Sequence, residues 1–199
     1  MIPSLYLASQ SPRRRELLAQ IGVDFQTLMV DVVEQRLVGE MPADYVRRLA
    51  ADKAKAGGKL LLEGISGAAS TIPILGSDTV VVLGDQVLEK PADEAEAVAM
   101  LLALSGRAHQ VMTAVSFYTP ERQQTMLSVT DVVFREITES EAHRYWQTGE
   151  PCDKAGGYGI QGLGAVFVTE IHGSYTGVVG LPLEQTYLLL DSFGIAYCQ

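Results

Sequence analysis

The sequence predicts an α/β protein, because strand candidates and helix candidates follow one another along most of the chain. Two further observations agree with this class. Hydrophobic residues make up 47% of the chain, which is typical of a soluble globular protein. The length of 199 residues is sufficient for one domain, or two lobes, with a substantial core. Since no repeat or linker interrupts the pattern, we expect residues 1–199 to form a single domain.

The chain begins with a strand that leads directly into a helix. Leu5-Tyr6-Leu7-Ala8 is an apolar run of strand length. Ser11 and Pro12 are residue types preferred at the N-cap and at the first position of a helix, and Gly22 is a typical C-terminal stop.

The turn between this strand and helix carries two hydroxyls and two guanidinium groups, from Ser9, Ser11, Arg13 and Arg14. Free N–H groups and the helix dipole favour an anion at this end of a helix. A guanidinium group can also donate two parallel hydrogen bonds to the oxygens of one phosphate. The alternative is a capped surface helix with a solvated basic first turn. Because two cations there oppose the dipole, the pattern favours phosphate binding.

The remaining elements follow from periodicity and from start and stop signals. We expect strands over 25–30, 72–83 and 86–88, an antiparallel pair over 109–118 and 126–135 at the far end of the sheet, and a hairpin of 165–171 with 175–179. We expect helices from Pro42 to about Ala56, from Asp93 to Leu104, from Thr138 to Gly149 and over 182–193, with a helix end and loop over 57–70.

Two charged residues fall on apolar faces of these elements. Lys53 lies seven positions after Val46 on the inward stripe of its helix, so it needs a partner or a ligand unless it only snorkels at the rim. Asp78 interrupts an apolar strand, which a buried strand does not accept without a partner.

A glycine-rich loop over 153–164 also suggests binding. Its five glycines allow close approach of the backbone to a ligand, although such a loop can be a simple flexible turn. Because Asp153, Lys154 and Gln161 stand among these glycines, we favour a binding loop.

Composition narrows the class of partner. The net charge of −9 argues against nucleic-acid polymers and anionic membranes. Cys152 and Cys198 are far apart and indicate reduced thiols in a cytoplasmic protein, and the three histidines have no metal-ligand spacing. We expect neither a signal peptide nor a membrane span.

Basic and acidic residues alternate among the conspicuous polar positions, which also include Glu34 and the pair Glu89-Lys90. Cationic side chains suit a polyphosphate, and carboxylates suit a divalent cation or the deprotonation of water. The residues therefore indicate metal-dependent phosphate chemistry. The absence of a Walker A motif argues against a P-loop enzyme.

Four motifs in order resemble the Maf family of nucleoside triphosphate pyrophosphatases. They are Ser9-x-Ser11-Pro12-Arg13-Arg14, Gly76-x-Asp78-Thr79, Glu89-Lys90-Pro91 and Asp153-Lys154-Ala155-Gly156-x-Tyr158-Gly159-Ile160-Gln161-Gly162. The resemblance covers essentially the whole chain and is strongest to the subgroup that acts on dTTP and UTP.

The resemblance implies an elongated mixed α/β fold of two lobes with a central cleft, similar to the inosine triphosphatase type. It implies hydrolysis of a nucleoside triphosphate to the monophosphate and pyrophosphate, a Mg²⁺ or Mn²⁺ cofactor, a homodimer and a link to the clearing of non-standard nucleotides. Two alternatives stay open: a nucleotide-binding regulator of septum formation, and the same reaction on CTP or 7-methyl-GTP.

The resemblance also assigns roles. It implies Asp78 as the catalytic residue and Arg13, Thr79 and Gln161 as specificity residues, and from the carboxylates themselves we expect Glu34 and Asp78 to be metal ligands. The expected phosphate-binding residues are Ser9, Arg13, Arg14, Lys53 and Lys90, and further active-site candidates are Glu89, Asp153 and Lys154.

Overall fold

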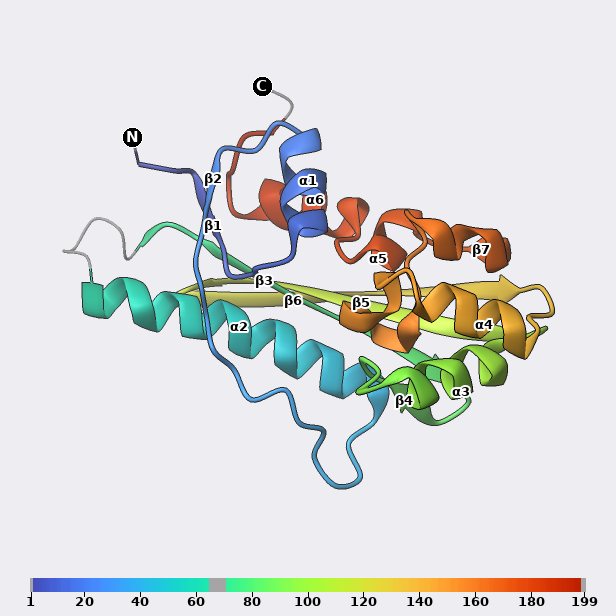
Figure 1. Cartoon of the computed structure of the whole chain (residues 1–199). Coiled ribbons are helices and arrows are strands. Elements are labelled where there is room, and N and C mark those ends of the chain that lie inside the picture. The colour runs from blue at the N-terminus through green and yellow to red at the C-terminus, as the bar shows by residue number, and fades with distance from the viewer. Residues whose placement is uncertain (1, 65–70, 198–199) are drawn as a thin grey trace. The chain divides into compact units, whose positions relative to one another are not determined.

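The structure is a computed structural model that describes residues 2–64 and 71–197. Its strands form a seven-stranded mixed sheet in the order β2-β1-β3-β5-β6-β7, with β4 paired to β3. Helices come between and after these strands along the chain (Figure 1). The predicted α/β class is therefore confirmed.

Contacts divide the chain into two compact units, in line with the expected lobes. The first unit comprises the described residues of Met1–Asp78, Thr113–Ser128 and Gly180–Gln199, and the second comprises those of Thr79–Met112 and Val129–Val179.

The first strands of the chain pair in parallel. β1 (Leu5–Leu7) pairs in parallel with β2 (Phe25–Thr27) on one side and with β3 (Ile74–Leu83) on the other. The strand expected over 25–30 is shorter than predicted. Its pairing ends where the N–H of Leu28 bonds to the carbonyl of Leu7, because β1 stops there and the chain turns into the first helix.

Helix α1 (Pro12–Gln20) has the predicted boundaries. The Ser11 side chain accepts a hydrogen bond from the N–H of Arg14, and Gly22 adopts a positive φ of 68° just beyond the helix. The final helix, α6 (Leu183–Ser192), also lies within its expected range.

Helix α2 (Pro42–Gly64) is longer than predicted, since it continues through two glycines in the supposed loop. These glycines fit where side chains would not. A Cβ on Gly57 would lie 2.8 Å from Cγ2 of Ile74, and one on Gly58 would lie 2.4 Å from Cε1 of Tyr118. Beyond them Leu61 is buried against Tyr6, so packing overrides the weak helix propensity of glycine. The rest of the expected loop, residues 65–70, lies outside the described residues.

The second unit begins with the predicted hairpin. β4 (Gln86–Leu88) pairs antiparallel with β3, opposite Val81 to Leu83. Helix α3 (Glu94–Leu104) follows; its N-cap Asp93 accepts from the N–H of Glu96, whose own carboxylate accepts from the N–H of Ala92. α3 packs against α4 (Glu139–Trp146).

The long strands β5 (Ala108–Thr119) and β6 (Arg122–Phe134) are neighbours in the sheet, as predicted. They are not its far end, because β7 (Val168–His172) pairs antiparallel with β6.

The hairpin predicted from 165–171 and 175–179 is wrong. Its first half contains the end of a 3₁₀ turn and most of β7, and its second half is the helix α5 (Tyr175–Val179). Ser174 explains the difference, because its hydroxyl accepts from the N–H of Gly177 and its carbonyl accepts from the N–H of Val178. These local bonds start a helical turn instead of a returning strand.

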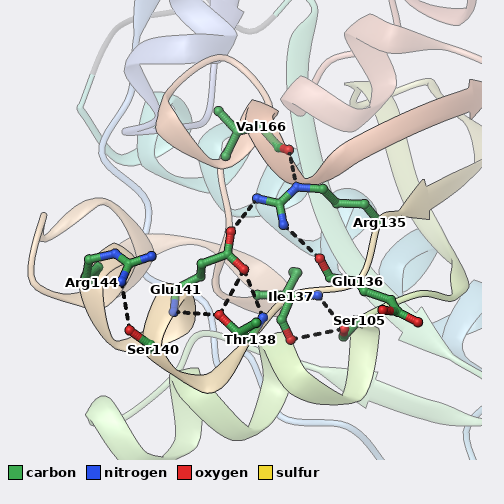
Figure 2. Close-up of polar contacts among 9 residues, drawn as sticks. All are labelled: Ser105, Arg135, Glu136, Ile137, Thr138, Ser140, Glu141, Arg144 and Val166. Carbon is green, nitrogen blue, oxygen red and sulfur yellow. Dashed lines mark hydrogen bonds and ion pairs between the residues drawn. The ribbon is translucent and has the colours of Figure 1, made fainter.

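Helix α4 starts at the predicted capping box. The hydroxyl of Thr138 accepts from the N–H of Glu141, and the carboxylate of Glu141 accepts from the N–H of Thr138 (Figure 2). The same carboxylate takes a hydrogen bond from Arg135 at 2.8 Å, and Arg135 also donates to the carbonyl of Val166 (Figure 2). The helix ends at Trp146, three residues before the Gly149 that we expected to end it.

None of the described helices combines the length and the apolar composition that a bilayer crossing requires.

Candidate active site

The turn between β1 and α1 gathers the polar groups predicted there. Ser9 is buried, and its hydroxyl accepts from the N–H of Ser11 at 3.2 Å and from Nη1 of Arg14 at 3.4 Å. Arg13 is the adjoining residue of the first helical turn and is half-buried. A serine hydroxyl, two guanidinium groups and a helix N-terminus thus occupy one turn, which is the arrangement expected of an anion site.

A backbone carbonyl ties this turn to β3. The oxygen of Gly180 accepts from Nε of Arg14 at 2.8 Å and from the hydroxyl of Ser77 at 3.1 Å. Sequence reasoning did not assign a role to Gly180 or Ser77. Its only usable signal was the position of Ser77 directly before Asp78, since nothing local links residues that stand 103 positions apart.

Lys53 has the partners that its place on the apolar stripe required. Its Nζ lies 2.6 Å from Oδ1 of Asp78 and 2.5 Å from Oε1 of Glu34. The Lys53 and Asp78 side chains are 12% and 9% exposed, whereas Glu34 is 44% exposed. One ammonium group therefore bridges a buried carboxylate and a more solvated one.

Small residues bring α2 close enough to β3 for this contact. A Cβ on Gly76 would lie 2.3 Å from the carbonyl oxygen of Ala50 and 3.1 Å from Cβ of Ala54. Residues i and i+2 of a strand share a face, so Gly76 and Asp78 both face α2. Gly76 lets the helix approach, and Asp78 then meets Lys53 on the next part of the same face.

Burial and charge act against each other at Asp78. Burial is the largest influence and raises the pKa of Asp78 above its usual value, while Lys53 and Arg14 lower it and Glu34 raises it further. For Arg14, burial lowers the pKa, and Asp78 and Glu34 oppose that effect. The site is thus a compact set of mutually interacting charges around one buried carboxylate.

The Asp78–Glu34 pair fits a hard divalent cation. Both carboxylates contact the same nitrogen, so their oxygens lie near one another. Mg²⁺ typically takes one or two protein carboxylates and completes its shell with phosphate oxygens and water. Within residues 2–64 and 71–197, no group of three or more His, Cys, Asp or Glu residues could hold a metal ion.

The other predicted site residues belong to the second unit. Thr79 follows Asp78 in β3 and is half-buried, while Lys90 and Gln161 are exposed. Glu89 is hydrogen-bonded to the glycine loop, because the backbone carbonyl of Glu89 accepts from the N–H of Gly156 at 3.0 Å.

The glycine loop contains the 3₁₀ segment η3 (Ala155–Gly157) and overlaps η2 (Glu150–Asp153) at its start and η4 (Leu163–Phe167) at its end. Nζ of Lys154 donates to Oδ1 of Asp153 at 2.7 Å and to the carbonyl of Glu150 at 2.6 Å. Lys154 therefore holds its own loop, which sequence reasoning did not anticipate.

Comparisons with known proteins agree with the motifs. The family model described as "Maf-like protein" matches residues 4–193. A protein of Saccharophagus degradans named "dTTP/UTP pyrophosphatase" is 65% identical over 195 residues, which are 98% of this chain and 91% of that protein. Proteins of the same name from Photobacterium profundum and Escherichia coli O157:H7 are each 52% identical, over 95% and 96% of this chain and 96% and 93% of their own lengths, respectively.

Proposed function

Because the chain belongs to the Maf-like protein family, we propose that it hydrolyses nucleoside triphosphates, dTTP and UTP before others, to the nucleoside monophosphate and pyrophosphate. The observation that carries this proposal is the contact of Lys53 with both Asp78 and Glu34. This contact brings together a carboxylate base, a cation for phosphate oxygens and a pair of carboxylate oxygens that can bind a metal ion. The relatives named above have this activity in their names.

In the proposed reaction, the water oxygen bonds to the α-phosphorus, the bond from that phosphorus to the oxygen that bridges it to the β-phosphate breaks, and pyrophosphate leaves with that oxygen. Asp78 takes the proton of the attacking water. Its raised pKa brings it nearer to neutral pH, which improves a general base. Ser9, Arg13, Arg14, Lys53 and Lys90 bind the triphosphate oxygens, and Glu89, Asp153 and Lys154 are further candidates in the second unit.

A divalent cation, Mg²⁺ or Mn²⁺, is part of this proposal. Glu34 and Asp78 would hold it, and when bound it neutralises charge on the phosphate oxygens. This also addresses the net charge of −9, which otherwise disfavours a polyanionic substrate.

Arg13, Thr79 and Gln161 are the proposed specificity residues. The Gln161 amide can accept from the imide N–H of uracil or thymine and donate to a neighbouring carbonyl. Cytosine reverses these donors and acceptors. An unpaired polar group costs about 1–3 kcal/mol, or roughly tenfold or more in preference.

The experiment that tests the activity is incubation of the purified protein with Mg²⁺ or Mn²⁺ and each common nucleoside triphosphate in parallel, with 7-methyl-GTP included. We expect pyrophosphate and monophosphate, fastest from dTTP and UTP. Nucleotide binding without pyrophosphate would instead favour a binding regulator. We further propose a cytoplasmic homodimer, whose mass light scattering would measure.

The base preference has its own test. In Gln161→Glu a carboxylate cannot donate, so kcat/KM for dTTP and UTP should fall relative to CTP. An unchanged ranking would mean that Gln161 only braces its loop.

A further inference from the structure

One carboxylate in the second unit holds the C-terminal side of the short turn that carries Gln161, together with the tyrosine that holds the other side. Oε1 of Glu150 accepts from the hydroxyl of Tyr145 at 2.7 Å and from the N–H of Gly164 at 3.0 Å. Its Oε2 accepts from the N–H of Leu163 at 2.8 Å.

Tyr145 extends the same network to the other side of the turn. Its hydroxyl donates to Glu150 and accepts from the N–H of Gly159 at 3.0 Å. Residues 159 and 163–164 are therefore both anchored, and the exposed Gln161 lies between the anchors. A turn closed by a further bond, from the N–H of Gly162 to the carbonyl of Gly159, has little freedom left.

The glycines of this turn fit the anchor. A Cβ on Gly162 would lie 2.2 Å from Oε2 of Glu150, and one on Gly164 would lie 2.6 Å from the hydroxyl of Tyr145. One on Gly159 would lie 2.7 Å from Cε of Lys154. The sequence suggested that these glycines admit a ligand, but the structure shows them admitting Glu150, Tyr145 and Lys154.

We infer that Glu150 and Tyr145 are positioning residues that hold the Gln161 turn in the shape that favours uracil and thymine nucleotides. This inference rests on the proposed function, because it concerns the base preference of that reaction. Glu150 touches neither phosphate nor base in this role; it acts through the backbone of 159–164.

The chemistry of the anchor requires an ionised carboxylate. An ionised Glu150 accepts at every lone pair, which suits three donors. Burial acts to raise the pKa of Glu150, but the N–H of Gly164, the Tyr145 hydroxyl and the N–H of Leu163 lower it overall. A glutamine of the same shape would turn an NH₂ group toward one of these donors, so one anchor would be lost.

The test compares Glu150→Gln and Tyr145→Phe with the wild-type protein, using dTTP, UTP and CTP. We expect KM for dTTP and UTP to rise while kcat changes less, and the preference over CTP to narrow by about tenfold. We also expect the amide that loses its acceptor in Glu150→Gln, that of Leu163 or that of Gly164, to exchange hydrogen at least about tenfold faster. Tyr145→Phe keeps the packing of the ring on Phe167 and should free Gly159 in the same way.

Glu141→Gln is the matched control, because Glu141 is also a carboxylate with several donors, and these belong to Arg135 and to Thr138, the N-cap of α4 (Figure 2). It should leave the substrate ranking unchanged.

The possible outcomes separate the inference from the proposed function. Unchanged exchange and unchanged ranking in both anchor variants would overturn the inference, as would an equal narrowing in Glu141→Gln. If Glu150→Gln does not fold, Tyr145→Phe decides alone. If the wild-type protein releases no pyrophosphate from any triphosphate, the proposed function fails, and base selectivity, the substance of this inference, fails with it; faster exchange would then establish only the anchor.

Discussion

Nζ of Lys53 lies 2.6 Å from Oδ1 of Asp78, although the two residues stand 25 positions apart in separate elements. The same nitrogen contacts Glu34. One ammonium group thus serves two carboxylates, and the Arg14 guanidinium also interacts with both of them. A triphosphate brings oxygens that compete for Lys53. Binding of metal and substrate is therefore expected to change the ion pairs among Lys53, Asp78 and Glu34.

Asp78→Asn removes the proposed base and keeps its shape. Pyrophosphate release should fall by at least about 100-fold, because general-base catalysis contributes about that much or more. Asp52→Asn is the control, since Asp52 is a half-exposed acid on the same helix as Lys53, paired with Arg48. Near-normal turnover in folded Asp78→Asn would exclude Asp78 from this role.

The same variant should not lose stability at neutral pH. The pKa of Asp78 is raised in the folded state, so between its unfolded value and its folded value the native protein binds more protons. Stability from this group is therefore lost as pH rises through that window. Asn cannot ionise, so the unfolding free energy of the variant, measured with urea, should decline less as the pH rises above about 4. A clear loss of stability at pH 7 would contradict this reading.

Lys53→Ala leaves Asp78 and Glu34 without their shared cation. We expect kcat/KM to fall by about 100-fold or more, with a smaller effect on the midpoint of thermal unfolding, because Lys53 binds phosphate in the proposed reaction. Lys55→Ala removes an exposed lysine two positions along the helix and should leave both unchanged. Unfolding of Lys53→Ala, with normal activity per folded molecule, would make Lys53 structural.

Gly76→Ala places a methyl group 2.3 Å from the carbonyl oxygen of Ala50. Since that oxygen is backbone, α2 must move, and we expect a loss of about 1–3 kcal/mol in unfolding free energy together with reduced activity. Gly57→Ala is the comparison, because its methyl group meets the side chain of Ile74, and alanine improves helix propensity. Chemical denaturation measures the unfolding free energy of both variants. An equally small loss in Gly76→Ala and in Gly57→Ala would argue against a role of Gly76 in placing Lys53.

His109 makes the second unit sensitive to acid. It is buried, its Nε2 lies 2.8 Å from the Tyr158 hydroxyl, and burial lowers its pKa to about 4. The unfolded chain binds this proton more readily, so stability is present above about pH 6.5 and is lost as pH falls toward about 4. From pH 8 to pH 5 the loss should be about 2 kcal/mol.

His109→Gln keeps a polar group near Tyr158 but does not titrate, so its unfolding free energy should depend less on pH in this range. His143→Gln is the control, because His143 is a half-exposed histidine of the same unit. Identical pH dependence in the wild-type protein and His109→Gln would refute the assignment.

The sequence by itself determined the parts of this protein that depend on neighbouring residues. The caps at Ser11 and Thr138 bond to N–H groups three residues away, and the hairpin at Gly84 is equally local. It also determined that Lys53 and Asp78 need partners, since burying a lone charge is costly whatever the fold. The motifs indicated the family for the same reason: each is a short run read directly.

Only the tertiary structure decided who those partners are. Gly57 reads as a helix stop, yet α2 continues because Ile74 lies against it. The choice of Asp78 and Glu34 for Lys53, and of the Gly180 carbonyl for Arg14, joins residues far apart in the chain. Such contacts depend on how helices and strands pack, and the free energy of packing is a property of facing surfaces that no local pattern contains.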